Sequence, residues 1–161
     1  MLSIITNNNF KNNLTIISGG QSGVDRAALD FAITYGISCG GFCPKGRLAE
    51  DGVIHIKYPL QETNSSLYEE RTVKNVDISD ALLLILDDEL DVGSELALST
   101  ARKLSKPVLI INLKSPRPIK EIKFWINKNM PCRINFAGPR ESNSPGIYDN
   151  TYAYLEELIH N

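Results

Sequence analysis

The segment Leu14–Asp30 constrains what this chain can fold into more than any other. A short apolar run over Leu14–Ile17 is followed by Gly19–Gly23, which holds three glycines within five residues. Apolar residues then recur at helical spacing from Val24 onward, so the segment predicts a strand, a glycine loop and a helix. This arrangement points backbone N–H groups and the positive end of a helix dipole at one spot. We therefore expect the loop to bind an anion.

The rest of the chain continues the alternation of apolar runs and amphipathic segments. Strands are expected at Leu14–Ser18, Ile37–Phe42, Ala81–Leu86, Val108–Asn112 and Arg133–Ala137. Helices are expected at Val24–Tyr35, Ser66–Ile78, Glu95–Leu104, Ile119–Lys128 and Tyr148–Ile159. Such alternation predicts an α/β fold, a doubly wound parallel sheet of about five strands with helices on both faces.

Three further features mark where these elements begin and end. Gly36 is expected to cap the first helix at its C-terminus, and Ser66 to cap the second helix at its N-terminus. The polar segment Leu48–Ser65 is expected to be a loop.

Length and charge set the broad class of the protein. One domain is expected over residues 14–161, because single domains commonly contain roughly 100–200 residues. The Asn-rich segment 1–13 is expected to be disordered. A net charge of −2 argues against nucleic-acid binding, and no apolar run approaches the roughly 18 residues of a membrane span. Without a signal pattern at the N-terminus, the chain is expected to be cytoplasmic.

The carboxyl ends of the expected strands locate the site. Ligands of parallel α/β sheets bind outside these ends. The loops there are Gly19–Gly23, Pro44–Asp51, Asp87–Ser94 and Gly138–Ser142, and they are the loops richest in glycine, serine and charged residues. We expect them to form one binding site.

The first of these loops fits no common nucleotide or hydrolase motif. Gln21 stands where a dinucleotide fingerprint needs glycine, and Val24 where a serine nucleophile elbow needs glycine. The side chains of Gln21 and Ser22 can donate hydrogen bonds to a ligand. Asp25 either stabilises the helix N-terminus or accepts from a ligand. Arg26 either pairs with a phosphate or is solvated.

The second loop brings positive charge to the same edge. The turn Pro44-Lys45-Gly46-Arg47 carries two cations that suit an oxyanion, or it is a solvated basic turn. It is not a Walker A loop, because Arg47 stands where the motif has lysine. Glu50 and Asp51 follow, and either they contribute to the site or they neutralise Lys45 and Arg47.

The third loop predicts a second anion-binding turn. Gly93 and the backbone around Ser94 can form one, or Ser94 is a plain helix cap. Arg71 belongs to a charged helix face or points back toward the pocket. The chain has only His55 and His160 as histidines, so a Ser-His-Asp triad is not expected, and no spacing selects a pair of acid–base carboxylates. Cys39, Cys43 and Cys132 lack the spacing of a zinc site and are expected to be inert thiols.

Taken in order, these motifs resemble the molybdenum cofactor carrier protein family. The matching segments are Ser18–Ala28, Cys39–Gly52, Tyr58–Thr63, Arg71-Thr72, Asn75-Val76, Ala137–Ser142 and Ser144–Ile147. The chain departs from the family at Val92-Gly93-Ser94, where Gly-Gly-Thr is expected, so the second loop can be shaped differently.

The resemblance implies a Rossmann-like, non-catalytic, oligomeric protein that stores and protects molybdenum cofactor and delivers it to molybdoenzymes. Phosphate, sulfate or molybdate can stand in for this ligand, a phosphorylated pterin with a dithiolene-held molybdenum oxo group. The residues expected to bind it are Gly19, Gly20, Gln21, Ser22, Gly23, Asp25, Arg26, Pro44, Lys45, Gly46, Arg47, Glu50, Asp51, Arg71, Gly93 and Ser94.

Two other functions remain open on the sequence. One is a nucleotide-processing enzyme similar to the nucleoside monophosphate phosphoribohydrolases, although Ala97 stands where their loop carries a glutamate. The other is a module that senses a nucleotide or ADP-ribose without chemistry.

Overall fold

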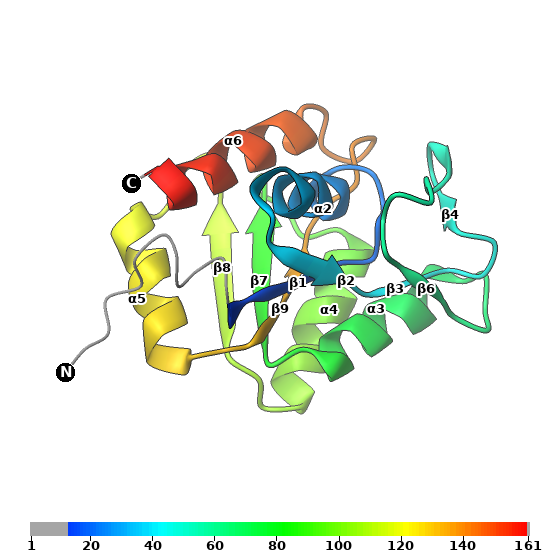
Figure 1. Ribbon diagram of the computed structural model, residues 1–161, viewed down its shortest axis with the longest axis horizontal. Coiled ribbons are helices and arrows are strands. Elements are labelled where there is room, and N and C mark those ends of the chain that lie inside the picture. The colour runs from blue at the N-terminus through cyan, green and yellow to red at the C-terminus, as the bar shows by residue number, and fades with distance from the viewer. Residues whose placement is uncertain (1–12, 161) are drawn as a thin grey trace.

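Five parallel strands form the central sheet of the protein (Figure 1). The computed structural model describes residues 13–160, so the expectation of disorder over 1–13 lies outside the described residues except for Asn13. The strand order is β2-β1-β9-β7-β8, and every neighbouring pair is parallel. The strands are β1 (Thr15–Ile17), β2 (Ser38–Gly40), β7 (Ala81–Leu86), β8 (Val108–Asn112) and β9 (Arg133–Ala137).

Helices cover both faces of this sheet, as the alternation of the sequence predicts. One face carries α2, α5 and α6, and the other carries α3 and α4 (Figure 1). The helices are α2 (Val24–Tyr35), α3 (Tyr68–Ile78), α4 (Val92–Lys103), α5 (Ile119–Asn129) and α6 (Ile147–His160). The doubly wound α/β fold is thereby confirmed. Within residues 13–160, no helix is long and apolar enough to cross a bilayer.

The central strand β7 shows why the sheet is covered on both sides. Its six residues are all buried. Leu83 and Ile85 pack into the core beneath α2, α5 and α6, whereas Leu82 and Leu84 pack against α3 and α4. Side chains alternate across a strand, so an apolar residue at every position requires an apolar layer on each face.

The predicted second strand is divided at Gly41. Strand β2 ends at Gly40, and Phe42-Cys43 forms a separate short strand, β3, which pairs with β6 (Gln61–Glu62). Gly41 has φ +132°, and a Cβ atom there would lie 2.3 Å from the carbonyl oxygen of Ser18. The backbone of β1 therefore forces the bend, and one continuous strand over Ile37–Phe42 is wrong.

The predicted polar loop Leu48–Ser65 is also more structured than expected. It contains a small hairpin of β4 (Leu48–Ala49) and β5 (Gly52–Val53), and the strand β6. Beneath it, Ile54, Tyr58 and Leu60 are buried with Leu29 of α2 in a third apolar cluster. This excursion from the central sheet, residues 48–65, lies beyond the edge strand β2 (Figure 1).

The ends of two helices test the predicted caps. Gly36 adopts the left-handed conformation with φ 67°, and its N–H donates to carbonyls of the last turn of α2, so this cap is confirmed. The helix α3 begins two residues later than predicted, after Leu67, and no side chain caps it. The serine that turns the chain is Ser65, whose hydroxyl accepts from the Leu67 N–H at 3.0 Å. The prediction of a Ser66 cap is wrong.

Candidate functional site

A small pocket lies at the carboxyl edge of the sheet, where β1, β7 and β9 end. Its volume is about 40 Å³, room for about three water molecules. Its walls come from the glycine loop after β1, from α3, from the start of α4 and from β9 with the loop after it. The polar side chains that line it include Gln21, Asp25, Arg71, Ser94, Asn135 and Arg140.

Two hydrogen-bonding groups in this pocket have no partner in the described part of the chain. They are the Nε2 atom of Gln21 and the hydroxyl of Ser94, on side chains 5% and 2% exposed. The orientation of the Gln21 amide is set by its oxygen, which accepts from the N–H groups of Ser22 at 3.0 Å and Glu50 at 2.8 Å. An unsatisfied buried polar group costs about 1–3 kcal/mol. Both residues line the same pocket, which indicates a ligand site.

A buried ion pair forms the floor of the pocket. The Arg71 guanidinium of α3 lies 3.1 Å from the Asp25 carboxylate of α2, and the two side chains are 9% and 10% exposed. Burial raises the pKa of the Asp25 carboxyl, and the positive charge of Arg71 opposes this shift. Gly19 makes room for the pair, because a Cβ atom there would lie 1.9 Å from the Arg71 Nη1 atom. Arg71 therefore lines the pocket rather than a solvated helix face, and Asp25 is its counter-ion; a ligand role for Asp25 stays a prediction.

The backbone N–H groups of the glycine loop largely donate hydrogen bonds to other groups of the protein. The N–H of Gln21 donates to the Asp25 carboxylate at 3.4 Å, and the N–H of Gly20 to the Ser18 hydroxyl at 3.4 Å. The N–H of Val24, at the start of α2, donates to the Pro139 carbonyl at 3.2 Å. The anion that this loop holds is thus the protein's own carboxylate. The donors left for a ligand are side chains.

The loop before α4 differs from both of its predicted forms. The helix begins at Val92 rather than Glu95, and Asp91 is its cap, with the Ser94 N–H donating to the Asp91 carboxylate at 2.8 Å. Burial acts to raise the pKa of the Asp91 carboxyl, but hydrogen bonds from Ser94 and Asn143 hold this pKa below its usual range. Ser94 is therefore not the cap; its hydroxyl lies close enough to the Asp91 carboxylate to lower the pKa of that group but makes no hydrogen bond of normal geometry within residues 13–160, and Ser94 lines the pocket beside Gly93. Val92 is 83% exposed in the first turn.

Several pocket residues were not among those expected to bind the ligand, although Arg140 and Asp91 lie in loops that were expected at the site. Arg140 reaches the pocket from the loop after β9, and Asn135 lies within β9. A signal existed for Asn135, since it is an amide inside the apolar run of a buried strand. The same pocket is lined by Thr72, Asn75 and Asp91.

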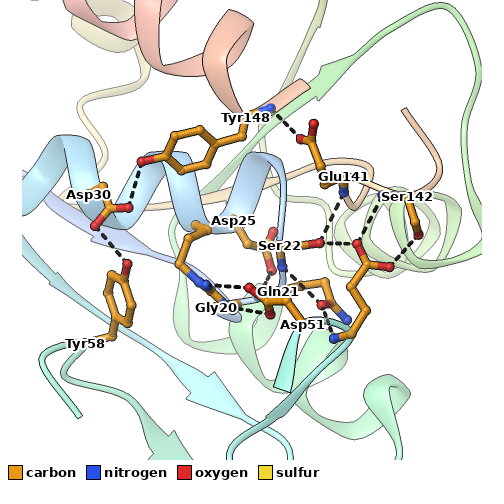
Figure 2. A network of polar contacts seen from close by, with 12 residues as sticks. Gly20, Gln21, Ser22, Asp25, Asp30, Asp51, Tyr58, Glu141, Ser142 and Tyr148 are labelled. Carbon is orange, nitrogen blue, oxygen red and sulfur yellow. Dashed lines mark hydrogen bonds and ion pairs between the residues drawn. The ribbon is translucent and has the colours of Figure 1, made fainter. Parts of the chain in front are cut away.

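Four predicted residues form a network beside the pocket. Arg26 pairs with Asp51 through two contacts at 3.0 and 3.1 Å and donates to the Gly20 carbonyl. Glu50 accepts from the hydroxyls of Ser22 and Ser142. Figure 2 shows Ser22 and Ser142 in this network. These contacts join the hairpin to the glycine loop and to the loop after β9, so Asp51 neutralises Arg26 rather than the basic turn.

The basic turn lies apart from the pocket. The Arg47 side chain donates to four backbone carbonyls of the excursion, those of Ile54, His55, Tyr58 and Leu60. Lys45 is exposed, and Gly46 donates its N–H to Glu62 at 2.6 Å. Pro44, Lys45, Gly46 and Arg47 are not among the residues that line the pocket. Arg47 holds the excursion together, and a ligand role for Lys45 stays a prediction.

We expect Glu50 to make stability depend on pH. Burial acts to raise the pKa of the Glu50 carboxyl, but hydrogen bonds from Ser142 and Ser22 hold this pKa below its usual 4.5. The unfolded chain then binds this proton more tightly than the folded chain, so the stabilisation is complete above pH 4.5 and is lost as the pH falls through the folded pKa. Glu50→Gln should lower the melting temperature at pH 7, and the deficit should shrink toward pH 3.

Thermal unfolding monitored by circular dichroism across this pH range measures the effect. Glu157→Gln, which neutralises an exposed carboxylate on α6, is the control and should show little deficit at any pH. A deficit for Glu50→Gln that is independent of pH would contradict the assignment.

A second hollow, of about 410 Å³, lies on the other side of Ser22, near Tyr58 and Tyr148. Its central carboxylate, Asp30, already accepts from both tyrosine hydroxyls at 2.8 Å and from Lys57 at 3.1 Å (Figure 2). Its polar groups are largely paired with one another, which makes it a weaker candidate than the pocket with two unused donors.

The described residues offer no cluster for holding a metal directly. Across residues 13–160, no group of three or more His, Cys, Asp or Glu side chains is placed to bind a metal ion. Cys39, Cys43 and Cys132 are free thiols. Burial raises the pKa of the Cys39 and Cys43 thiols, which agrees with unreactive side chains.

Comparisons with known proteins give two matches. The family model described as "Circularly permutated YpsA SLOG family" matches residues 16–159. The crystal structure of a protein from Syntrophus aciditrophicus SB, named "Putative molybdenum carrier protein", is 43% identical in sequence, with a TM-score of 0.86. The alignment covers 91% of this chain and 96% of that one. A comparison with curated proteins gives no match. The chain therefore belongs to the circularly permuted YpsA SLOG family.

Proposed function

We propose that this protein binds molybdenum cofactor as cargo, protects it and carries it to molybdoenzymes. The observation that carries the proposal is the pair of unused buried donors, Gln21 Nε2 and Ser94 Oγ, in one pocket with two guanidinium groups. The name of the similar protein from Syntrophus aciditrophicus supports the choice of cargo.

The donors of the pocket suit the anionic part of this cargo. Arg71, Arg140 and the unused hydroxyl and amide groups all supply hydrogen atoms, and an oxyanion accepts them. A pocket of about 40 Å³ accommodates a compact head group and excludes a pterin ring system. Either the phosphate or the oxo-molybdenum end of the cofactor meets these requirements, and the pterin then lies outside.

A neighbouring hollow can receive the pterin. It has a volume of about 500 Å³ and shares Asp91 with the pocket. Its walls carry the acidic side chains of Asp87, Asp88 and Glu89, together with Lys114, which pairs with Asp87 at 3.5 Å and with Asp88 at 2.8 Å. Carboxylates accept hydrogen bonds from the amino and ring N–H groups of a pterin. The two hollows together thus offer donors to one end of the cofactor and acceptors to the other.

The surroundings of α4 favour binding over nucleotide cleavage. Ala97, at the position where the resembled phosphoribohydrolases carry a glutamate, is fully buried against the sheet. Glu95 is exposed and is not among the residues that line the pocket. Release of free base from nucleoside monophosphates by the purified protein would reverse this preference, and tighter binding of a nucleotide or ADP-ribose than of the cofactor would replace the cargo.

Ser94→Ala gives the sharpest test of the proposal. The variant removes a hydroxyl that has no protein partner, so the melting temperature should stay the same or rise. Affinity for anoxically prepared cofactor should fall about ten- to hundredfold, because one hydrogen bond to a charged group, worth about 1.5–3 kcal/mol, is lost. Retained molybdenum and pterin after gel filtration, together with the lifetime of the cofactor in air, measure binding and protection.

A matched control lies on the same helix. Ser99 is exposed and its hydroxyl donates to the Leu96 carbonyl at 3.1 Å, so Ser99→Ala should leave cofactor binding unchanged. If the natural sequence retains neither molybdenum nor pterin, the proposal is wrong. If Ser94→Ala binds as well as the natural sequence, the pocket is not the site.

A further inference from the structure

Tyr68, the first residue of α3, stands between the two arginines of the pocket. The guanidinium carbon of Arg71 lies 5.6 Å from the centre of the Tyr68 ring, and that of Arg140 lies 5.1 Å from it. The electron-rich face of an aromatic ring attracts a cation within about 6 Å. One ring therefore contacts two positive charges that come from segments about 70 residues apart in the sequence.

The two arginines depend on this ring to different degrees. Arg71 has a buried counter-ion in Asp25 at 3.1 Å, and its Nε atom donates to the Tyr68 carbonyl at 3.3 Å. Arg140 makes no side-chain hydrogen bond within residues 13–160, and its nearest carboxylate, Glu50, is 4.0 Å away. The Arg140 guanidinium therefore has two supports, a long ion pair with Glu50 and the contact with the Tyr68 ring, and its N–H groups make no hydrogen bond within residues 13–160.

We propose that Tyr68 is a positioning residue that holds the Arg140 guanidinium at the mouth of the pocket, ready to bind the oxyanion of the cargo. The inference rests on the proposed function and adds the residue that orders one of its charges. A free arginine side chain loses roughly 2 kcal/mol of rotamer entropy when it is immobilised. Holding it beforehand lowers the cost of binding. The ring also lies against Arg71, so the positive charge facing the pocket is concentrated on one side.

A double-mutant cycle tests this role, with molybdate and phosphate as separate probes in titration calorimetry and the anoxic cofactor as a third. Tyr68→Leu should weaken binding about three- to tenfold, whereas Tyr68→Phe, which keeps the ring, should bind as the natural sequence does. In the Arg140→Gln background, Tyr68→Leu should have no further effect, because the residue it positions is gone. Arg102→Gln, which removes an exposed charge from α4, controls for net charge.

Each other outcome overturns the inference in a distinct way. Additive losses in the cycle would show that Tyr68 does not act through Arg140. A loss in Tyr68→Phe equal to that in Tyr68→Leu would show that the hydroxyl touches the ligand. If the natural sequence binds none of the three probes, the proposed function falls and this inference with it. If the natural sequence binds any probe but the cycle fails, only the proposed role of Tyr68 is contradicted.

Discussion

Arg71→Met is expected to lower the free energy of unfolding by about 3–5 kcal/mol, because it leaves the buried carboxylate of Asp25 without a counter-charge. Asp25 is 7% exposed and lies at the start of α2, beneath the glycine loop. Without Arg71, the strongest influence that lowers the pKa of this carboxyl is gone, so its pKa should rise further. The protonated carboxyl needs no counter-charge, so the loss of stability should be largest near neutral pH and should shrink as the pH falls.

Urea unfolding at several pH values measures this effect, and two variants sharpen it. Adding Asp25→Asn to Arg71→Met should recover much of the stability, since no buried charge then remains. Lys74→Met on the same helix breaks the exposed pair with Glu70 and should cost no more than about 0.5 kcal/mol. A loss for Arg71→Met as small as that for Lys74→Met would contradict a buried ion pair.

Gly23→Ala is expected to cost at least about 3 kcal/mol, the second large effect. Gly23 precedes α2 with φ 79° and ψ −132°, a conformation that L residues adopt only at a cost of about 1–3 kcal/mol. A Cβ atom there would also lie 2.4 Å from the Pro139 carbonyl oxygen. The loop after β9 would have to move away, carrying Arg140 with it, so ligand affinity should fall as well.

Gly36→Ala separates the two contributions. Gly36 also has a positive φ, 67°, but a Cβ atom there would meet nothing within 4 Å. This variant should therefore show backbone strain alone, about 1–2 kcal/mol, with unchanged ligand affinity. Equal losses for the two variants in chemical unfolding would show that the contact with Pro139 does not matter.

The sheet and its helices were predictable because their signals are local. The segments Ala81–Leu86, Val108–Asn112, Arg133–Ala137 and Val24–Tyr35 have the predicted bounds, since each is a mainly apolar run or a clear helical repeat. The excursion after β3 was not predictable in this way. Its strands are two residues long, too short for a period, and they are defined by packing on Leu29 of α2.

The place of the site was also predictable, but its chemistry was less so. The glycine loop and the loops near Ser94 and Arg140 meet at one edge because parallel strands end there. Which groups remain free depends on pairing across the fold. Asp25 and Arg71 are 46 residues apart in sequence, and nothing local shows that they meet. The sequence likewise could not show that four carbonyls engage the Arg47 guanidinium.

The carboxylate of Asp25 inside the glycine loop has a consequence for the kinetics of exchange. Loop amides that are already bonded need no arriving anion to order them, so the backbone of the pocket can keep one shape whether loaded or empty. Cargo would then be held by side chains that can swing aside, and loading and unloading would not have to wait for a loop to refold. If the proposed carrier function holds, surrender of the cargo to another protein would benefit from such a low barrier to release.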